Sequence, residues 1–205
     1  MKLAEFERGT LVKEHKEVAT TEPNGTQITF IPDDTVFKHY KFIDEYIENQ
    51  IWNYCYLNAG LIINYNGKKY VSKNGLLDLL ERKTTPDEIR DYKITEMDRT
   101  IVQLKGDDVE IAFSHSNDYG EEIYSFVNGQ HTTQGGTHQQ AFREAFVKTI
   151  RDFYKKDYEA SDIRQSIVAA VSVRVVEPVF ESQTKTKLGS INMDVKGPSV
   201  KSFMM

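Results

Sequence analysis

Apolar residues recur at helical spacing in three stretches of the chain. Residues 41–58 predict the first helix, and Gly60 is placed to end it. Its apolar face comprises Ile43, Ile47, Ile51, Tyr54 and Cys55. Residues 137–154 predict a longer helix with Thr137 as N-cap. Its core-facing positions are Phe142, Ala145, Phe146, Thr149, Ile150 and Phe153. Residues 76–82 predict a short third helix.

Turn signals mark two hairpins in the first third of the chain. Asn66-Gly67 lies between the strand-like residues 61–65 and 69–72. Pro23-Asn24-Gly25 lies between residues 9–16 and 26–32, which predict two further strands. An isolated hairpin is marginally stable. The earlier pair of strands is therefore expected to belong to a sheet outside this region.

Strand patterns return between Asp91 and Asn128, where three or four strands follow one another as a meander. Such connections predict antiparallel pairing. The polar residues 128–136 predict a flexible loop ahead of the long helix. The apolar run 167–176 then predicts a buried strand. Because a helix separates this run from the meander, we expect a crossover and a mixed sheet.

Composition narrows the class of protein. The 205 residues include 39% hydrophobic residues and carry a formal charge of -5. This length suits one domain, or one domain with a piece of another. The mildly acidic balance argues against a general polyanion binder, although local basic faces could still meet DNA. Cys55 is the single cysteine, so no internal disulfide can form.

No apolar run is long enough to span a bilayer, and the N-terminus lacks an apolar signal core. We therefore expect no membrane association and a cytoplasmic location.

The segment with most chemical potential follows the buried strand. Pro178 interrupts that strand, and Gln183, Thr184, Lys185 and Lys187 then supply hydrogen-bond donors. A donor-rich loop at a strand end can hold an anionic group. The alternative is an ordinary solvated loop, which lysines commonly decorate.

Other chemistry is not indicated. The sequence has no Gly-x-x-x-x-Gly-Lys-Ser/Thr phosphate loop. The five histidines are scattered without metal-ligand spacing, so we expect no metal site. The pairs Asp33-Asp34 and Asp107-Asp108 occur at turns, where aspartate is common for conformational reasons.

Several motifs together resemble one family. They are Gln183-Thr184-Lys185 continuing to Gly189, Tyr124-Ser125-Phe126-Val127-Asn128, Gly135-Gly136-Thr137-His138, and Phe142-Arg143. In this order they resemble bacterial type II topoisomerase B subunits, meaning gyrase B and topoisomerase IV B. The resemblance extends from about Arg8 to about Ser190.

The resemblance implies an α+β transducer domain of the ribosomal-protein domain-2-like kind. Its sheet would be mixed and mostly antiparallel, with helices on one face and a left-handed βαβ crossover. Residues 1–34 would be the last hairpin of an upstream ATPase domain, and 35–190 the transducer. Residues 191–205 would begin the connector to a metal-binding TOPRIM domain. The chain would then be a segment of a longer subunit.

The resemblance also implies a role. In the family, the lysine matching Lys185 contacts the γ-phosphate of ATP, and the glutamine matching Gln183 assists. The arginine matching Arg143 lines a cavity through which duplex DNA passes. The full subunit would use ATP and Mg2+, dimerise on ATP binding and act with the topoisomerase A subunit. We expect this segment alone to bind neither cofactor and to be inactive.

Alternatives stay open at this point. Arg143 could simply pair with Glu144 or Asp152 on the helix surface. Lys148, Arg151 and Lys155 carry no family motif, and we expect His138 to be structural. The chain could instead be a stand-alone DNA-binding α+β module. It could also be the transducer of another ATPase of the superfamily, such as a mismatch-repair relative.

Overall fold

The computed structural model describes residues 1–25, 27–84, 101–116 and 119–205. The chain divides into two compact units, Met1–Asp44 and Glu45–Met205, and each is described by itself. Residues 91–100 and 117–118 of the predicted meander lie outside the described residues.

The first unit contains an antiparallel hairpin, formed by β1 (Ala4–Glu7) and β2 (Thr10–Glu14). Arg8 and Gly9 connect the strands with φ angles of 49° and 79°. Two consecutive left-handed residues make the tight turn whose twist matches a hairpin. The hairpin predicted for residues 9–16 and 26–32 is therefore wrong, since its first strand pairs with residues 4–7 and residues 27–32 form no strand.

The second unit begins with a helix and a hairpin. Helix α1 (Asp44–Leu57) confirms the first predicted helix, and β3 (Ile62–Tyr65) pairs with β4 (Lys68–Val71) around Asn66-Gly67 as predicted. The buried face of α1 carries Ile51, Cys55 and Tyr56. Tyr54, predicted for that face, is 43% exposed.

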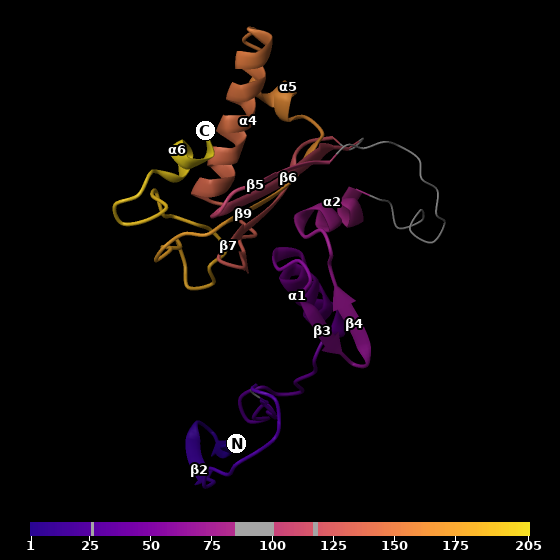
Figure 1. Ribbon diagram of the computed structural model, residues 1–205, viewed down its shortest axis with the longest axis vertical. Helices are drawn as coiled ribbons and strands as arrows, with labels where there is room; N and C mark the ends of the chain where they lie inside the picture. Colours follow the sequence, from indigo (N-terminus) through magenta and orange to yellow (C-terminus); the bar gives the residue numbers. More distant parts are fainter. Residues whose placement is uncertain (26, 85–100, 117–118) are drawn as a thin grey trace. The chain divides into compact units, whose positions relative to one another are not determined.

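A five-stranded sheet forms the centre of this unit (Figure 1). Its strands are β5 (Val102–Lys105), β6 (Val109–His115), β7 (Glu122–Val127), β8 (Gln130–His131) and β9 (Ile167–Val173). Their order is β5-β6-β9-β7-β8. Among these described strands, the β7–β9 pair is parallel and the other pairs are antiparallel, which confirms a mixed, mostly antiparallel sheet. The simple meander was wrong in one respect, because β9 lies between β6 and β7.

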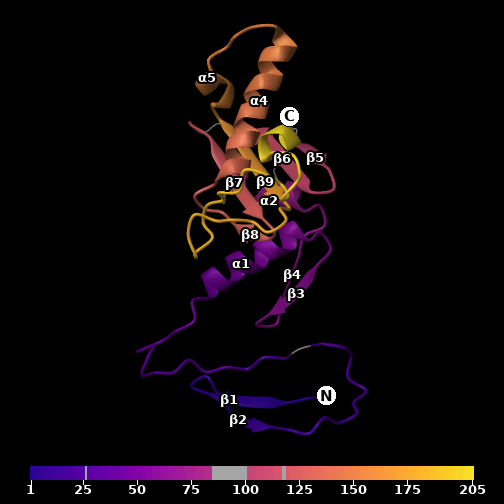
Figure 2. The same cartoon turned by 90° about the vertical axis from the view of Figure 1, so that its left-hand side faces the viewer.

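Helices cover both faces of this sheet, which corrects the prediction of one covered face. Val168 and Ala170 of β9 pack in a cluster with Leu76 and Leu80 of α2 (Leu76–Thr84). The alternate residues Ile167, Ala169 and Val171 pack in another cluster with Phe142 of α4 (Thr137–Tyr154). Successive side chains of a strand point to opposite faces. A strand that is apolar on both faces therefore needs a helix on each side (Figure 2).

Helix α4 confirms the long predicted helix but differs at both ends. Its N-cap is Gly136, and Thr137 is the first helical residue. At the other end, Phe153 is 76% exposed rather than buried, because the last turns extend past the sheet (Figure 1). Two short helices follow, α5 (Ala160–Arg164) and α6 (Val200–Met204). No helix within the described ranges has the length and apolar character needed to cross a bilayer.

The covered faces can be tested separately by trimming one core residue on each. Leu80→Ala, on the α2 side, and Phe142→Ala, on the α4 side, should each lower the free energy of unfolding by about 2–5 kcal/mol because each leaves a cavity. Urea unfolding followed by the fluorescence of Trp52, the single tryptophan, measures this change. Leu104→Ala on the edge strand β5, where the side chain is 54% exposed, should change stability by less than about 0.5 kcal/mol. A loss on one face only would contradict the two-faced core.

Candidate functional site

The donor-rich loop is a narrow excursion between Val179 and Ser190. Glu181 N–H donates to the carbonyl of Lys187, and Gly189 N–H donates to that of Val179 (2.8 Å). At the tip, Lys185 N–H donates to the carbonyl of Ser182 (3.1 Å), which closes a turn over Gln183 and Thr184. Lys185 itself has a positive φ of 55°. The tip thus has a defined backbone path.

Backbone bonds fasten this loop to the start of α4. Gln134 N–H donates to Thr186 O (2.9 Å), Leu188 N–H to Gly135 O (3.0 Å), and Thr137 N–H to Leu188 O (3.1 Å). The Thr137 hydroxyl adds a bond to Ser190 O (2.6 Å). Two motifs that are about fifty residues apart in sequence are therefore paired in space.

Gly136 is required for this pairing. Its φ is 134°, and a Cβ on it would lie 2.4 Å from the carbonyl oxygen of Leu188. Such a distance is far inside van der Waals contact, and the obstacle is backbone that cannot rotate away. Only glycine permits this approach.

Asn128 holds the other end of the loop region. Its side-chain amide donates to Val175 O (2.8 Å) and its Oδ1 accepts from Val175 N–H (2.9 Å). This two-point bond joins the end of β7 to the chain just after β9. The last residue of the Ser-Phe-Val-Asn run is thus structural, and it anchors the chain at Val175, ahead of the loop.

A buried polar network lies between β7 and α4. Ser125 and Thr132 exchange hydrogen bonds, and Thr132 Oγ1 lies 3.1 Å from Nε2 of His138, which is fully buried. Burial lowers the pKa of His138 to about 4, so the imidazole is neutral near pH 7. The expected structural role of His138 agrees with this position.

Gln183 and Lys185 differ from all these polar residues. Both are exposed, and within the described part of the chain neither side chain has a hydrogen bond or an ion pair. Their neighbour Lys187 is paired with Glu181 at 2.9 Å between Nζ and Oε1. Among the residues that the structure describes, no group of three or more His, Cys, Asp or Glu could hold a metal ion.

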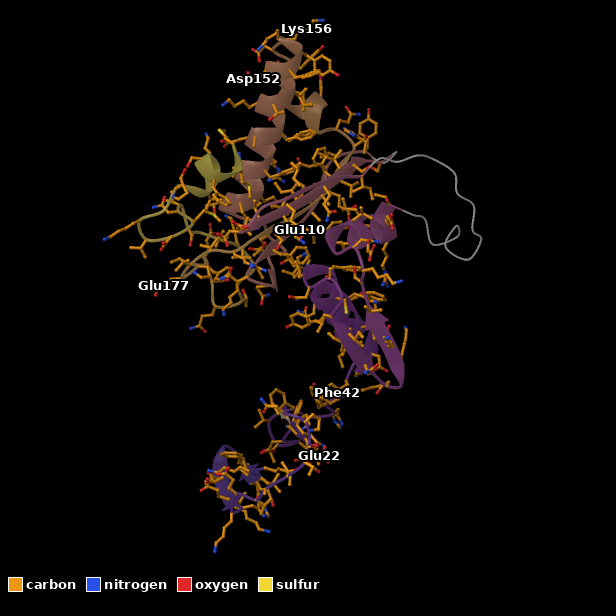
Figure 3. All side chains as sticks on the ribbon, in the orientation of Figure 1. Glu22, Phe42, Glu110, Asp152, Lys156 and Glu177 are labelled. Atoms are coloured by element: carbon orange, nitrogen blue, oxygen red, sulfur yellow. The ribbon has the colours of Figure 1, made fainter. Side chains whose placement is uncertain are left out.

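Arg143 lies on α4 and is paired, but not with the residues expected from sequence. Its Nη2 lies 2.6 Å from Oε1 of Glu121, just before β7. The two expected partners are elsewhere: Glu144 pairs with Lys201 of α6, and Asp152 lies near the far end of α4 (Figure 3). The side chain of Arg143 is 28% exposed, so it is still partly accessible.

A cavity of about 570 Å³ is lined by residues of the loop, α4 and α6. Leu188, Ala141 and Val200 form apolar parts of its lining, and Arg143, Glu144, Lys187 and Lys201 are charged parts. Lys201 and Gln140 both bond the Glu144 carboxylate, and these bonds lower the pKa of Glu144. Arg143 and the base of the loop, at Glu181 and Lys187, therefore border one cavity, whereas Gln183 and Lys185 are not part of its lining.

Two residues beside Arg143 were missed from sequence, Glu121 and Arg164, which form an ion pair. Asn128 belongs to the Ser-Phe-Val-Asn motif, but its bond to Val175 was not predicted. The positive φ of Asn128 is compatible with an asparagine following a strand, which is the one signal available. Nothing in the spacing of Glu121 and Arg164 indicates their contact.

Comparison with the sequences of known proteins identifies the relatives of this chain. A family model described as DNA gyrase B matches residues 66–202. The B subunit of DNA topoisomerase 4 from Borreliella burgdorferi is 44% identical over 186 residues, covering 91% of this chain and 30% of the relative. The B subunit of DNA gyrase from Cytophaga hutchinsonii is 31% identical over 211 residues, covering 94% and 44%. The chain thus spans less than half the length of these relatives.

Solved structures support the fold. The 43K ATPase domain of Thermus thermophilus gyrase B matches with a TM-score of 0.68 at 23% identity, covering 98% of this chain and 57% of that one. The B-subunit of the DNA gyrase from Myxococcus xanthus matches with a TM-score of 0.72 at 17% identity, covering 99% and 60%.

The mixed five-stranded sheet and the long helix α4 agree in fold with these solved gyrase B structures. The chain belongs to the DNA gyrase B family, and it corresponds to the transducer region of type II topoisomerase B subunits.

The close approach at Gly136 gives a direct test of the loop anchor. Gly136→Ala should lower the free energy of unfolding by about 3 kcal/mol or more, since it combines a clash with Leu188 and an unfavourable φ. Gly129→Ala is the matched control, because Gly129 also has a positive φ (82°) but no atom within 4 Å of a new Cβ. The control should cost only about 1–2 kcal/mol. Equal losses in chemical denaturation would show that the contact with Leu188 is unimportant.

The buried His138 predicts a pH dependence of stability. The unfolded histidine takes a proton below its ordinary pKa of 6.5, whereas the folded one stays neutral until about pH 4. Stability from this neutral imidazole is therefore fully present above pH 6.5 and is lost as the pH falls toward 4, by roughly 3 kcal/mol in total. His138→Gln removes the titration. The stability of the wild-type chain minus that of the variant should shrink between pH 7 and pH 4.5, and a difference independent of pH would contradict the assignment. His131, whose pKa is also lowered by burial, is present in both proteins and cancels.

Proposed function

We propose that this chain is the ATP-responsive transducer of a type II topoisomerase B subunit, and that Lys185 is its sensing residue. The supporting observation is the contrast within the paired motifs. The loop backbone is fixed to α4, while the side chains of Gln183 and Lys185 are exposed and have no partner among the described residues. A fixed loop with two unused donors suits an anionic ligand supplied from outside the segment.

The ligand proposed is the γ-phosphate of ATP bound in an upstream domain. That phosphate is the group that distinguishes ATP from ADP, and a lysine beside it feels the difference in charge. The same cation can stabilise the charge that develops during phosphoryl transfer. Gln183 would add an amide donor to the same group.

The cofactors, partners and domain bounds of the full subunit are proposed from its family. The full subunit would bind ATP with Mg2+ held by the upstream domain, dimerise on ATP binding, and act with an A subunit on duplex DNA. Residues 1–34 would end the ATPase domain, residues 35–190 would be the transducer, and residues 191–205 would lead to the TOPRIM domain. The crossover from β7 to β9 through α4 would be left-handed.

Arg143 is proposed to contact the duplex DNA that passes through the central cavity of the full enzyme. Its bond to Glu121 uses part of a guanidinium that carries five N–H donors. Contacts of this kind go to phosphate and are independent of sequence.

The sensing role is tested in the full-length subunit. Lys185→Ala should lower the rate of ATP hydrolysis about 10- to 100-fold, because it removes a charge-assisted bond worth roughly 1.5–3 kcal/mol. Nucleotide should still bind, since most contacts to ATP would come from the upstream domain. Steady-state hydrolysis and calorimetric titration measure the two quantities.

Lys196→Ala is the control for the loss of an exposed positive charge elsewhere in the region. It should hydrolyse ATP at the wild-type rate. Normal turnover by Lys185→Ala would defeat the proposal. The 205-residue chain alone should show no micromolar binding of ATP, and such binding would contradict the expectation that this segment lacks the nucleotide pocket.

A further inference from the structure

Arg143 also lines a second cavity, a groove between α4 and α5. The groove has a volume of about 310 Å³. Four cationic side chains line the groove, together with the acidic side chains of Glu144 and Asp152. The cations are Arg143, Lys148, Arg151 and Arg164.

One carboxylate organises two of these cations. Glu121 Oε1 lies 2.6 Å from Nη2 of Arg143, and Glu121 Oε2 lies 3.2 Å from Nε of Arg164. A single negative charge cannot neutralise two guanidinium groups. Each arginine also carries five N–H donors. Since the two side chains are 28% and 31% exposed, they can reach a further acceptor from solvent.

The remaining groups of the groove differ in availability. Arg151 is committed to the carbonyl of Tyr158 (2.9 and 2.6 Å) and to Asp157. The acidic Glu144 is held by Lys201. Lys148 is exposed and, within the described residues, has no ion pair. The available positive charge therefore resides on Arg143, Arg164 and Lys148.

We propose that Arg143 and Arg164, positioned by Glu121, clamp one phosphate of a DNA backbone, and that Lys148 contacts a neighbouring phosphate. Arg143 and Lys148 are five residues apart, about 7.5 Å along the helix axis. One small anion would not use both ends of that span, whereas a DNA strand presents a row of separate phosphate charges. This proposal rests on the DNA contact proposed above for Arg143 and adds the residues that complete it.

The test uses fluorescence anisotropy to measure how two unrelated 40-bp duplexes bind the full-length subunit at several salt concentrations. Arg164→Ala should weaken binding about tenfold for both sequences, and it should lower the slope of log affinity against log salt by about 0.9, one phosphate contact. Arg164→Lys restores one charge and should restore the slope, but it should restore affinity only in part because lysine lacks the planar fork. Lys105→Ala, an exposed lysine of β5 outside the groove, should leave both quantities unchanged.

Two outcomes separate this inference from the function it extends. If Arg143→Ala weakens binding while a folded Arg164→Ala matches the wild type, the clamp is wrong and the role of Arg143 stands. If neither change affects binding, the DNA contact of Arg143 fails as well.

Lys148→Glu provides a test in which weaker binding cannot be attributed to unfolding, because this side chain is exposed. It should weaken DNA binding tenfold or more, and wild-type affinity would overturn the proposed path of the strand. Glu121→Gln should also weaken binding, because it releases both arginines; tighter binding would show that Glu121 masks the site and does not position it. Inorganic phosphate at millimolar concentration should compete poorly with the duplex. Efficient competition would identify a site for a single small anion and would contradict a backbone contact.

Discussion

The backbone pairing of Gly136 with Leu188 is the constraint on which the rest of the site depends. It brings the lysine loop against the first turn of α4, and three backbone bonds and the Thr137 hydroxyl make up the contact. Asn128 anchors the chain at Val175, ahead of the loop. The base of the loop is bonded to the start of α4, so the backbone that carries Lys185 is joined to that helix.

The strength of the proposed contact between Lys185 and a γ-phosphate limits what this contact can do alone. A charge-assisted bond of roughly 1.5–3 kcal/mol shifts an orientation about 10- to 100-fold. A nearly complete switch between two states needs about 5.5 kcal/mol. Under the proposed function, Lys185 therefore biases the position of the transducer, and dimerisation of the ATPase domains must supply the remainder. The stiffness of the two-faced core matters here, because a packed body turns as a whole and does not absorb the bias.

Local patterns predicted local structure well and arrangement less well. Asn66-Gly67 has the two left-handed residues that its hairpin needs, and the long apolar period gave α4. The first hairpin was misplaced because Arg8 is left-handed, which arginine seldom is, while Asn24-Gly25 carries the stronger turn signal. The apolar run of β9 already required cover on both faces. The resemblance implied helices on one face only, and this expectation conflicted with the apolar character of that run on both of its faces.

The site shows the same division between local and distant information. The motifs identify which residues matter, but hydrogen bonds spanning 47 and 53 residues show why. Ser125, Asn128, Thr137 and His138 are all occupied by internal bonds. Within the same motifs, Gln183 and Lys185 are polar side chains that the described structure leaves unused. Most of each motif therefore builds and places the loop. Gln183 and Lys185 therefore remain available to bind a ligand from outside. This difference between the bonded and the unbonded residues supports the proposed ligand contact of Lys185 more strongly than the motif match does.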